Sequence, residues 1–276
     1  MPELPEVETV RRGLTALVAG AQINKVQVPY PKAIVSDLAE FKEDLIGATI
    51  EKIDRRGKFL LFRLSSDQTL VSHLRMEGQY SVEPAGATPH KHTEVIFNLA
   101  DDRDLMYNDT RRFGRMQLVK TGQENQVVPG IAKMGPEPTE SDLTEEYLAK
   151  ILAKGHRMIK PFLLDQANLA GLGNIYTDEV LWQSKIHPET LTNQVSATEV
   201  ANLRENIITE LARATEHHGT TVHSFSNVFG EVGEFQNELD VYGRVGEPCR
   251  RCGEPLVKIK VAQRGTTYCP KCQIKK

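Results

Sequence analysis

The chain of 276 residues lacks several features that mark particular classes of protein. No run of apolar residues approaches the ~20 that a membrane-spanning helix needs, so we expect no membrane association. The N-terminus is rich in glutamate and has neither a basic segment nor an apolar stretch, which predicts no secretory leader and a cytoplasmic protein. Repeats and low-complexity tracts are absent as well. Its 39% apolar and 26% charged composition is typical of a globular protein with a sizeable core.

Positive charge is not in excess, because the formal net charge is −3. On its face this argues against nucleic acid as a partner. The average conceals an asymmetry: residues 241–276 carry nine lysines and arginines against two glutamates, a local charge of +7, which leaves −10 for the rest. A basic tail on an acidic body is typical of an interaction surface, although a solvated charged end fits equally.

Cysteine is absent until the last 28 residues, where four occur as two C-x-x-C pairs separated by sixteen residues. The pairs are Cys249 with Cys252 and Cys269 with Cys272. This spacing is typical of a four-cysteine zinc site, and four thiolates leave no open position for substrate, so we expect one structural zinc ion. Two disulfides are the alternative, which a cytoplasmic location disfavours. Residues 255–260 and 266–268 are predicted to form a β-hairpin with Arg264 at its tip.

In the rest of the chain the pattern of apolar residues changes from helical to β-type and back to helical. Apolar residues at helical spacing predict a short helix within 1–16, and 129–138 reads as a linker before a helical region. Between them lie seven short β-rich runs, at 23–28, 49–53, 59–64, 70–74, 94–99, 105–108 and 115–119. Strands at this spacing predict a sandwich or a flattened barrel. We therefore expect an α+β multidomain protein: a β-sandwich domain over 1–130, a helical domain over 131–240 and a zinc-binding β-hairpin over 241–276.

The N-terminus carries a candidate nucleophile. Removal of Met1 leaves Pro2 with a secondary amine, which condenses with an aldehyde-like carbon to an iminium ion. The reference pKa of an α-amino group is about 8, so part of it is uncharged at neutral pH. Glu3 places a carboxyl group beside it, and a nucleophile next to an acid/base group is typical of covalent catalysis. A frayed N-terminus is the alternative.

Three further residues are candidates for chemistry or phosphate binding. Lys58 lies between a turn and an apolar strand, where partial desolvation would favour the neutral amine, which can act as a base, or where a lysine simply reaches to solvent. Asn174 follows a Gly-x-Gly turn and is predicted to cap a helix from Ile175, whose N-terminus would bind phosphate. No complete G-x-G-x-x-G pattern follows a strand, so we expect no nucleotide cofactor. A guanidinium at Arg264 would grip phosphate, or is an ordinary surface arginine.

Two turns, 73–78 and 109–114, combine bulky and cationic residues. Met76 and Phe113 are poor choices for exposed turns. They suit wedges that enter a base stack, and they also suit ordinary core packing.

Together these motifs resemble the bacterial formamidopyrimidine-DNA glycosylases, which are bifunctional DNA glycosylases and abasic-site lyases. The resemblance covers essentially the whole chain. It rests on the two cysteine pairs and on PELPEVET (2–9), GK (57–58), HLRMEG (73–78), RRFG (111–114), LDQ (164–166), AGLGNIY (170–176), LDVYGR (239–244) and AQRG (262–265). It implies an N-terminal β-sandwich, a helix-two-turn-helix domain and a zinc finger, and a monomer that binds double-stranded DNA containing oxidised purines or abasic sites.

The resemblance also implies roles for individual residues. Pro2 attacks C1′ of the damaged nucleotide to form a Schiff base, Glu3 acts as general acid/base, and Lys58 assists elimination and contacts phosphate. Asn174 and Arg264 hold phosphates around the flipped nucleotide, and Arg264 also takes part in the second elimination.

The remaining roles implied by the resemblance concern DNA contacts. Lys160 corresponds to a lysine on the lesion side, and His92 to a DNA-contacting histidine. Met76, Arg111 and Phe113 correspond to residues that fill the gap left by the flipped base. The segment 217–237 corresponds to a loop that folds over that base.

The implied function is excision of 8-oxoguanine and formamidopyrimidines followed by cleavage on both sides of the sugar. The alternatives are an endonuclease VIII-like enzyme for oxidised pyrimidines and a non-catalytic zinc-ribbon DNA-binding protein. Two positions depart from the family pattern: Gly155 stands where some members have lysine, and 90–94 (HKHTE) differs from the usual Lys-His-Asp-His run.

Overall fold

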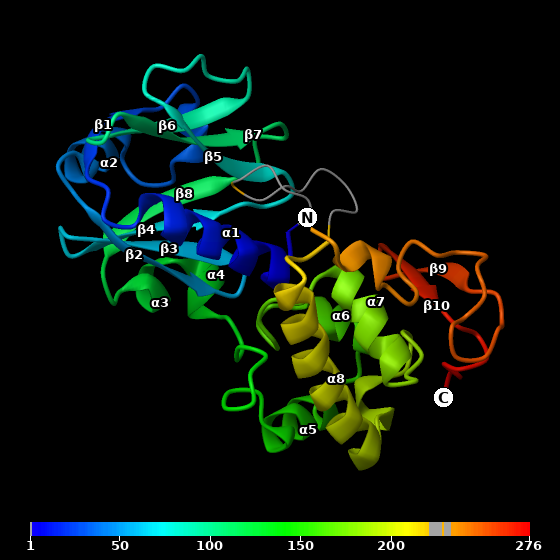
Figure 1. Ribbon diagram of the computed structural model, residues 1–276. Coiled ribbons are helices and arrows are strands. Elements are labelled where there is room, and N and C mark those ends of the chain that lie inside the picture. Colours follow the sequence, from blue (N-terminus) through cyan, green and yellow to red (C-terminus); the bar gives the residue numbers. More distant parts are fainter. Residues whose placement is uncertain (1, 221–227, 229–232) are drawn as a thin grey trace. The chain divides into compact units, whose positions relative to one another are not determined.

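The computed structural model describes residues 2–220, 228 and 233–276 (Figure 1). The chain divides into two compact units, Met1–Lys133 with His218–Glu234, and Met134–His217 with Phe235–Lys276. None of the helices in the described part combines the length and hydropathy needed to cross a lipid bilayer.

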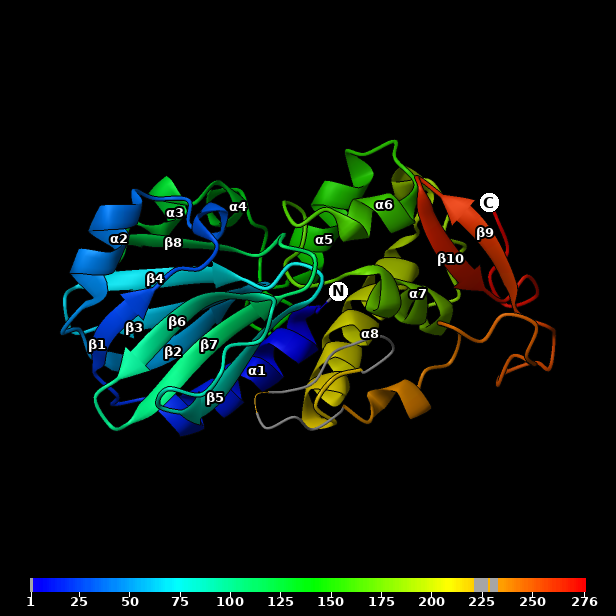
Figure 2. The same ribbon diagram turned by 90° about the horizontal axis from the view of Figure 1, so that it is seen from above.

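The first unit is a β-sandwich of two four-stranded antiparallel sheets, with strand orders β1-β6-β7-β5 and β2-β3-β4-β8 (Figure 2). The strands are β1 (Ile23–Gln27), β2 (Ile50–Arg56), β3 (Phe59–Leu64), β4 (Gln68–His73), β5 (Gly78–Pro84), β6 (Thr93–Leu99), β7 (Arg103–Asp109) and β8 (Arg115–Lys120). Apolar side chains of both sheets, such as Phe62 and Phe97, share one buried core. The sandwich expected from the sequence is confirmed.

The sequence prediction missed β5. This strand starts at Gly78, where the predicted interaction turn ends, and its inward side chains include Tyr80, which is 3% exposed. The alternation of Tyr80 and Val82 with polar residues was a readable strand signal, and it was overlooked beside the turn motif.

Short helices were also missed. Asp37 caps α2 (Leu38–Leu45) by accepting the backbone N–H groups of Ala39 and Glu40 at 2.8 and 3.0 Å. Further along, α3 (Glu124–Val127) and α4 (Pro129–Ala132) occupy the end of the first unit, so the predicted linker begins with a helical turn.

The first helix, α1 (Leu4–Val18), confirms the predicted N-terminal helix. Val7, Val10 and Leu14 form its buried face at helical spacing, and it packs beside β2 and β3 (Figure 1). Burial of a single valine or leucine side chain contributes about 1.5–3 kcal/mol, so these contacts anchor the N-terminal end of the chain to the sandwich.

The second unit contains the helices and the C-terminal hairpin. Its elements are α5 (Glu145–Ala153), α6 (Ile159–Leu164), α7 (Asn174–Gln183), η2 (Thr192–Gln194), α8 (Ala197–Glu216), η3 (Phe235–Asn237), β9 (Val257–Val261) and β10 (Arg264–Tyr268), and η1 (Pro31–Ala33) belongs to the first unit. Ser196 and Glu199 form a capping box at the start of α8. The hairpin β9–β10 packs on α7, which is buried from Ile175 to Trp182 (Figure 2).

The predicted hairpin is confirmed, but its turn lies one residue earlier than expected. Val261 pairs with Arg264, so Ala262 and Gln263 form a two-residue turn, with φ of 44° and 68°. The prediction that Arg264 stands at the tip was therefore wrong. Arg264 is the first residue of β10, and its backbone is held by strand pairing.

Candidate functional site

Pro2 and Glu3, the first two residues that the structure describes, are buried. Pro2 and Glu3 precede α1, and Glu3 is only 2% exposed. The carboxylate of Glu6 holds this end: Oε2 accepts the backbone N–H of Glu3 at 2.8 Å, and Oε1 accepts the backbone N–H and hydroxyl of Thr220 at 2.7 and 3.1 Å. The alternative of a frayed N-terminus is therefore wrong.

Glu6 was not identified from the sequence. Its spacing of three residues from Glu3 was the available signal, because a glutamate at that position commonly closes a helix N-terminus. Its contact with Thr220 spans 214 residues and has no sequence signature. Gly219 permits that contact, since its φ is +74° and a Cβ there would come within 2.6 Å of the Glu6 carboxylate.

Lys58 lies in the two-residue turn between β2 and β3, where Arg56 pairs with Phe59. Its side chain is 5% exposed, so the interpretation of a lysine reaching to solvent does not hold. His73, at the end of β4, is a neutral neighbour. Burial, reinforced by the charges of Arg75 and Lys58, lowers the pKa of His73 to about 3.

The structure brings together the three residues predicted to act as wedges. Arg111 Nη1 lies 3.0 Å from Met76 Sδ, and its guanidinium lies 5.0 Å from the centre of the Phe113 ring. Met76 is 38% and Phe113 48% exposed, so the core-packing alternative is wrong for both. They form an exposed cluster of apolar and cationic groups, hereafter the wedge cluster, of Met76, Arg111 and Phe113.

Asp109 organises the turn that carries two members of the wedge cluster. Its carboxylate accepts three backbone N–H groups, from Arg111 at 2.9 Å, Phe113 at 2.9 Å and Gly114 at 2.7 Å. Arg112 in the same turn has a φ of 58°, a conformation that costs a non-glycine residue about 1 kcal/mol or more. Asp109 offsets that cost, and the sequence analysis did not single it out.

Both wedge turns also pack against the hydroxyl of Tyr107. A Cβ on Gly78 would lie 2.2 Å from this oxygen, and a Cβ on Gly114 would lie 1.7 Å from it. The glycines that end the two motifs are therefore required by close approach to one fully buried tyrosine, rather than by the turns alone.

His90 and His92 line one surface cavity of about 360 Å³ together with Glu77 and Thr110. The backbone N–H of His92 donates to Nδ1 of His90 at 3.3 Å, and the ring centres are 5.4 Å apart. Both histidines thus face the same space, although only His92 was singled out from the sequence.

In the second unit, three predicted residues meet at β10. The backbone carbonyl of Gly265 accepts hydrogen bonds from Asn174 Nδ2 and Lys160 Nζ, both at 3.0 Å, and Arg264 is the preceding residue. Asn174 was predicted to cap α7, which is wrong. Gly173 has the extended backbone of the cap, and Asn174 is the first helical residue.

Lys160 is completely buried and forms an ion pair with Asp178, whose Oδ1 lies 2.6 Å from its Nζ. The other oxygen of Asp178 accepts the backbone N–H of Thr267 at 3.0 Å. Burial raises the pKa of Asp178 to about 6, against the opposing effect of Lys160. Asp178 was also missed from the sequence.

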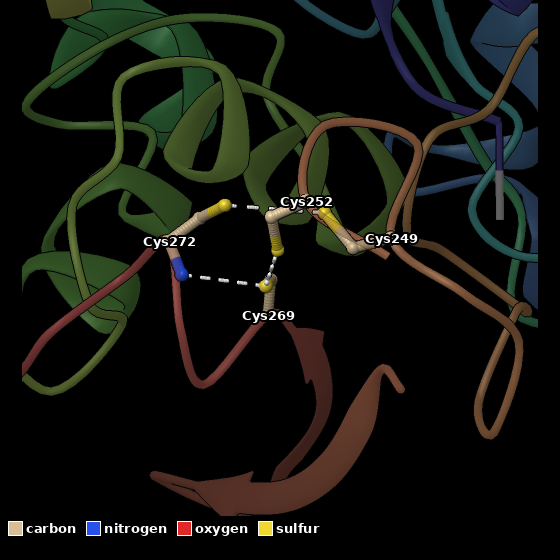
Figure 3. A group of neighbouring side chains, drawn as sticks. All are labelled: Cys249, Cys252, Cys269 and Cys272. Carbon is tan, nitrogen blue, oxygen red and sulfur yellow. Dashed lines mark hydrogen bonds between the residues drawn. The ribbon is translucent and has the colours of Figure 1, made fainter. Parts of the chain in front are cut away.

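The four cysteines form a metal site (Figure 3). Their sulfur atoms lie within 4.8 Å of one another, and the Cys249–Cys272 and Cys252–Cys269 pairs are 4.0 and 3.5 Å apart. Tetrahedral zinc with Zn–S bonds of about 2.3 Å requires sulfur separations of about 3.8 Å. The two printed separations lie close to this value, so the four sulfur atoms suit a zinc ion, and all four cysteines are free of disulfides.

Family models match most of the chain: the formamidopyrimidine-DNA glycosylase N-terminal domain over 1–116, the H2TH domain of the same enzymes over 134–226, and a zinc finger found in FPG and IleRS over 246–274. The chain belongs to the formamidopyrimidine-DNA glycosylase family. Its C-terminal hairpin is the family's zinc finger, and its four cysteines hold one structural zinc ion.

Relatives and solved structures agree with this membership. The formamidopyrimidine-DNA glycosylase of Lactiplantibacillus plantarum is 60% identical over 270 residues, covering 98% of both chains, and that of Ligilactobacillus salivarius is 57% identical over the full length of both. Lactococcus lactis Fpg was solved as a mutant in complex with Fapy-dG DNA and also in complex with abasic-site DNA. These structures are 45% identical, cover 99% of this chain and 100% of theirs, and have TM-scores of 0.94 and 0.93.

Neither alternative class is favoured by these matches, which name formamidopyrimidine-DNA glycosylases throughout. One expectation falls largely outside the described residues. The segment 217–237, expected to fold over an extruded base, includes 221–227 and 229–232, which the structure does not describe.

Proposed function

We propose that the chain excises oxidised purines from double-stranded DNA and then cleaves the strand at the resulting abasic site. Family membership supports the activity, and the solved relatives in complex with Fapy-dG and abasic DNA support the substrates. The single observation that carries the chemistry is the buried N-terminal pair Pro2 and Glu3, held by Glu6 rather than frayed.

The reaction that we assign to this pair is covalent. The Pro2 nitrogen attacks C1′ of the flipped nucleotide, the base leaves with the glycosidic electron pair, and the nitrogen loses its proton. Cleavage of the C1′–O4′ bond, with protonation of O4′, then opens the sugar and gives an iminium ion. The iminium acidifies C2′, so loss of a C2′ proton expels the 3′ phosphate. Loss of a further sugar proton then expels the 5′ phosphate. Glu3 acts as the general acid/base, Lys58 assists elimination, and Arg264 assists the second elimination.

Flipping a nucleotide costs a few kcal/mol, which a damaged base reduces. The wedge cluster offsets this cost because its exposed side chains suit the vacated space in the stack. Asn174, Arg264 and His92 are assigned to DNA phosphates. Lys160 contributes through the Gly265 carbonyl that it holds, since its ammonium is buried against Asp178.

A cytoplasmic location belongs to this proposal. Its support is the use of four thiols as metal ligands, which persists where thiols remain reduced. Cell fractionation with antibody detection tests it, and recovery in a secreted fraction would contradict it.

Borohydride trapping on a duplex that contains 8-oxoguanine tests the function. Wild type is expected to form a covalent adduct that the double variant Pro2→Gly, Glu3→Gln does not form. An undiminished adduct in that variant, or none in wild type, overturns the proposal. Glu51→Gln, a substitution of an exposed strand residue, is the matched control and should trap like wild type. Retention of Met1 or an added N-terminal tag should abolish trapping, because the nucleophile is then an amide.

A further inference from the structure

Helix α7 presents a row of three polar side chains to the zinc finger. Asn174, Asp178 and Trp182 are spaced four residues apart, so they lie on one face of the helix. Asn174 donates to the carbonyl of Gly265, and Asp178 accepts the N–H of Thr267. Trp182 Nε1 donates to Cys249 Sγ at 3.3 Å. The row therefore spans the hairpin from its first residues to the metal ligands.

Asp178 is the centre of this row. With Lys160 it grips two backbone groups of β10, the carbonyl of Gly265 and the N–H of Thr267, each at 3.0 Å. β10 pairs with β9 and has no other strand neighbour in the described sheet. The two side chains thus form hydrogen bonds with backbone groups on the free edge of β10, which a further strand would otherwise bind.

We propose that Asp178 is a positioning residue, which sets the place of Arg264 and Asn174 on DNA phosphates by fixing β10 on α7. The inference rests on the proposed function of those two residues. Arg264 immediately precedes Gly265, and Asn174 shares the Gly265 carbonyl with Lys160. Displacement of β10 therefore moves both groups, and displacements of ~1 Å in such positioning contacts cost ~100-fold in rate.

Stability alone does not account for a buried ion pair. Apolar residues of similar volume commonly serve as well or better in its place, because the desolvation of two charges is avoided. What an apolar pair cannot do is accept the Thr267 N–H and donate to the Gly265 carbonyl. The contacts of Asp178 and Lys160 with β10 are thus the feature that an apolar replacement would lose.

A double-mutant cycle tests the inference. Asp178→Asn and Arg264→Ala are made singly and together, and the dissociation constant for an abasic-analogue duplex is measured against salt. Each single variant is expected to weaken binding about tenfold, the equivalent of one charge-assisted hydrogen bond. Each should also reduce the slope of log affinity against log salt concentration, hereafter the salt slope, by about 0.9 in magnitude. This is the value expected for the loss of one phosphate contact. The double variant should have the same salt slope as Arg264→Ala alone, because both changes remove the same charged contact with phosphate. An additive loss of slope would overturn the inference.

Glu189→Gln is the matched control. Glu189 also joins the helical region to the zinc finger through a lysine, with Glu189 Oε2 and Lys275 Nζ 2.8 Å apart, but this pair is exposed. It should bind DNA like wild type. If it weakens binding as Asp178→Asn does, the inference is wrong.

Two further measurements separate positioning from folding and from catalysis. If Asp178→Asn does not fold, the variant Lys160→Met, Asp178→Leu replaces the pair by apolar groups; a wild-type salt slope in that folded variant overturns the inference. Without DNA, hydrogen exchange at the Thr267 amide should be about tenfold faster in that variant than in wild type. An unchanged exchange rate would contradict the inference. A chain that passes both tests but excises no oxidised purine refutes the proposed function and leaves the positioning role intact.

Discussion

Trp182 donates its indole N–H to the sulfur of Cys249 at 3.3 Å. It is the single tryptophan of the chain, and it is 7% exposed among the zinc-binding cysteines and Val241. The guanidinium of Arg251 lies over the indole ring, 4.0 Å from its centre. The indole is thus a hydrogen-bonding neighbour of the metal site, of the kind that orients ligands and tunes affinity.

Zinc removal should therefore change tryptophan fluorescence. Loss of the metal unfolds small zinc domains, so chelation should expose the Trp182 indole to water and shift its emission to longer wavelength. The shift should follow zinc release, measured with a chromogenic chelator, and DNA binding should be lost in parallel. Unchanged emission after complete zinc removal would contradict this expectation.

Trp182→Phe provides the control for the hydrogen bond itself. Phenylalanine keeps the apolar contact but donates nothing to Cys249. We expect zinc affinity to fall about 10- to 100-fold, as for other outer-shell partners. Equal affinity in competition with a chelator would show that the indole packs on the site without tuning it.

Glu6→Gln should destabilise the N-terminal end of the chain. The Glu6 carboxylate accepts three donors, and a glutamine amide would turn a donor toward at least one of them. We expect the free energy of unfolding to fall by about 1–3 kcal/mol, and borohydride trapping to slow because Glu3 is less well held. Urea unfolding and trapping rates measure the two effects. Values equal to those of the exposed control Glu51→Gln would refute the role of Glu6.

Asp109→Ala should release the wedge cluster. Three backbone N–H groups lose their acceptor, so the free energy of unfolding should fall by about 1–3 kcal/mol, and affinity for duplexes with an abasic analogue should fall with it. Asp109→Asn, which retains one acceptor oxygen, should be intermediate. Asp101→Asn, which removes the negative charge of an exposed partner of Arg103, should change stability by less than about 0.5 kcal/mol. Full DNA affinity in a folded Asp109→Ala variant would contradict the assignment.

Glu94 predicts a dependence of stability on pH. Burial and the charge of Asp109 raise the pKa of Glu94 from 4.5 to about 7, and neither of its oxygens has a hydrogen-bond partner among the described residues. Between these two pKa values the folded protein retains a proton that the unfolded chain releases. This contribution to stability is therefore complete below about pH 4.5, and it is lost as pH rises through about 7.

Glu94→Gln removes this dependence. The variant should be more stable than wild type by about 1–3 kcal/mol near pH 8, and should match it near pH 4.5. Urea unfolding at the two pH values measures the difference. Glu83→Gln, on the same sandwich but outside the core, should show no such pH-dependent gain. A constant difference between Glu94→Gln and wild type across this range would contradict the raised pKa.

The parts of the fold that sequence reasoning predicted correctly rest on short-range patterns. The helical spacing of apolar residues such as Val7, Val10 and Leu14 predicted α1. The two C-x-x-C pairs predicted the zinc site. Each pattern is contained within a helix, a hairpin or one turn, so its physical cause lies in neighbouring residues.

The missed residues have a different origin. Glu6, Asp109 and Asp178 are acidic side chains whose partners are backbone N–H groups, and such bonds leave no periodic trace. Asn174 was misplaced by one residue because the backbone of Gly173 already serves as the cap. The hairpin turn was also misplaced by one residue. Its two central residues, Ala262 and Gln263, adopt positive φ although neither is a glycine, so the sequence does not mark their position.

By itself the sequence determined the order of the three regions, the metal ligands and the candidate residues. All of these depend on composition, local spacing and motif, which are properties of the chain before it folds. Only the tertiary structure decided that Pro2 and Glu3 are buried, that Met76 and Phe113 are exposed, and that Asp178 with Lys160 holds β10. Burial and long-range hydrogen bonds are set by which surfaces meet, and no local pattern encodes that.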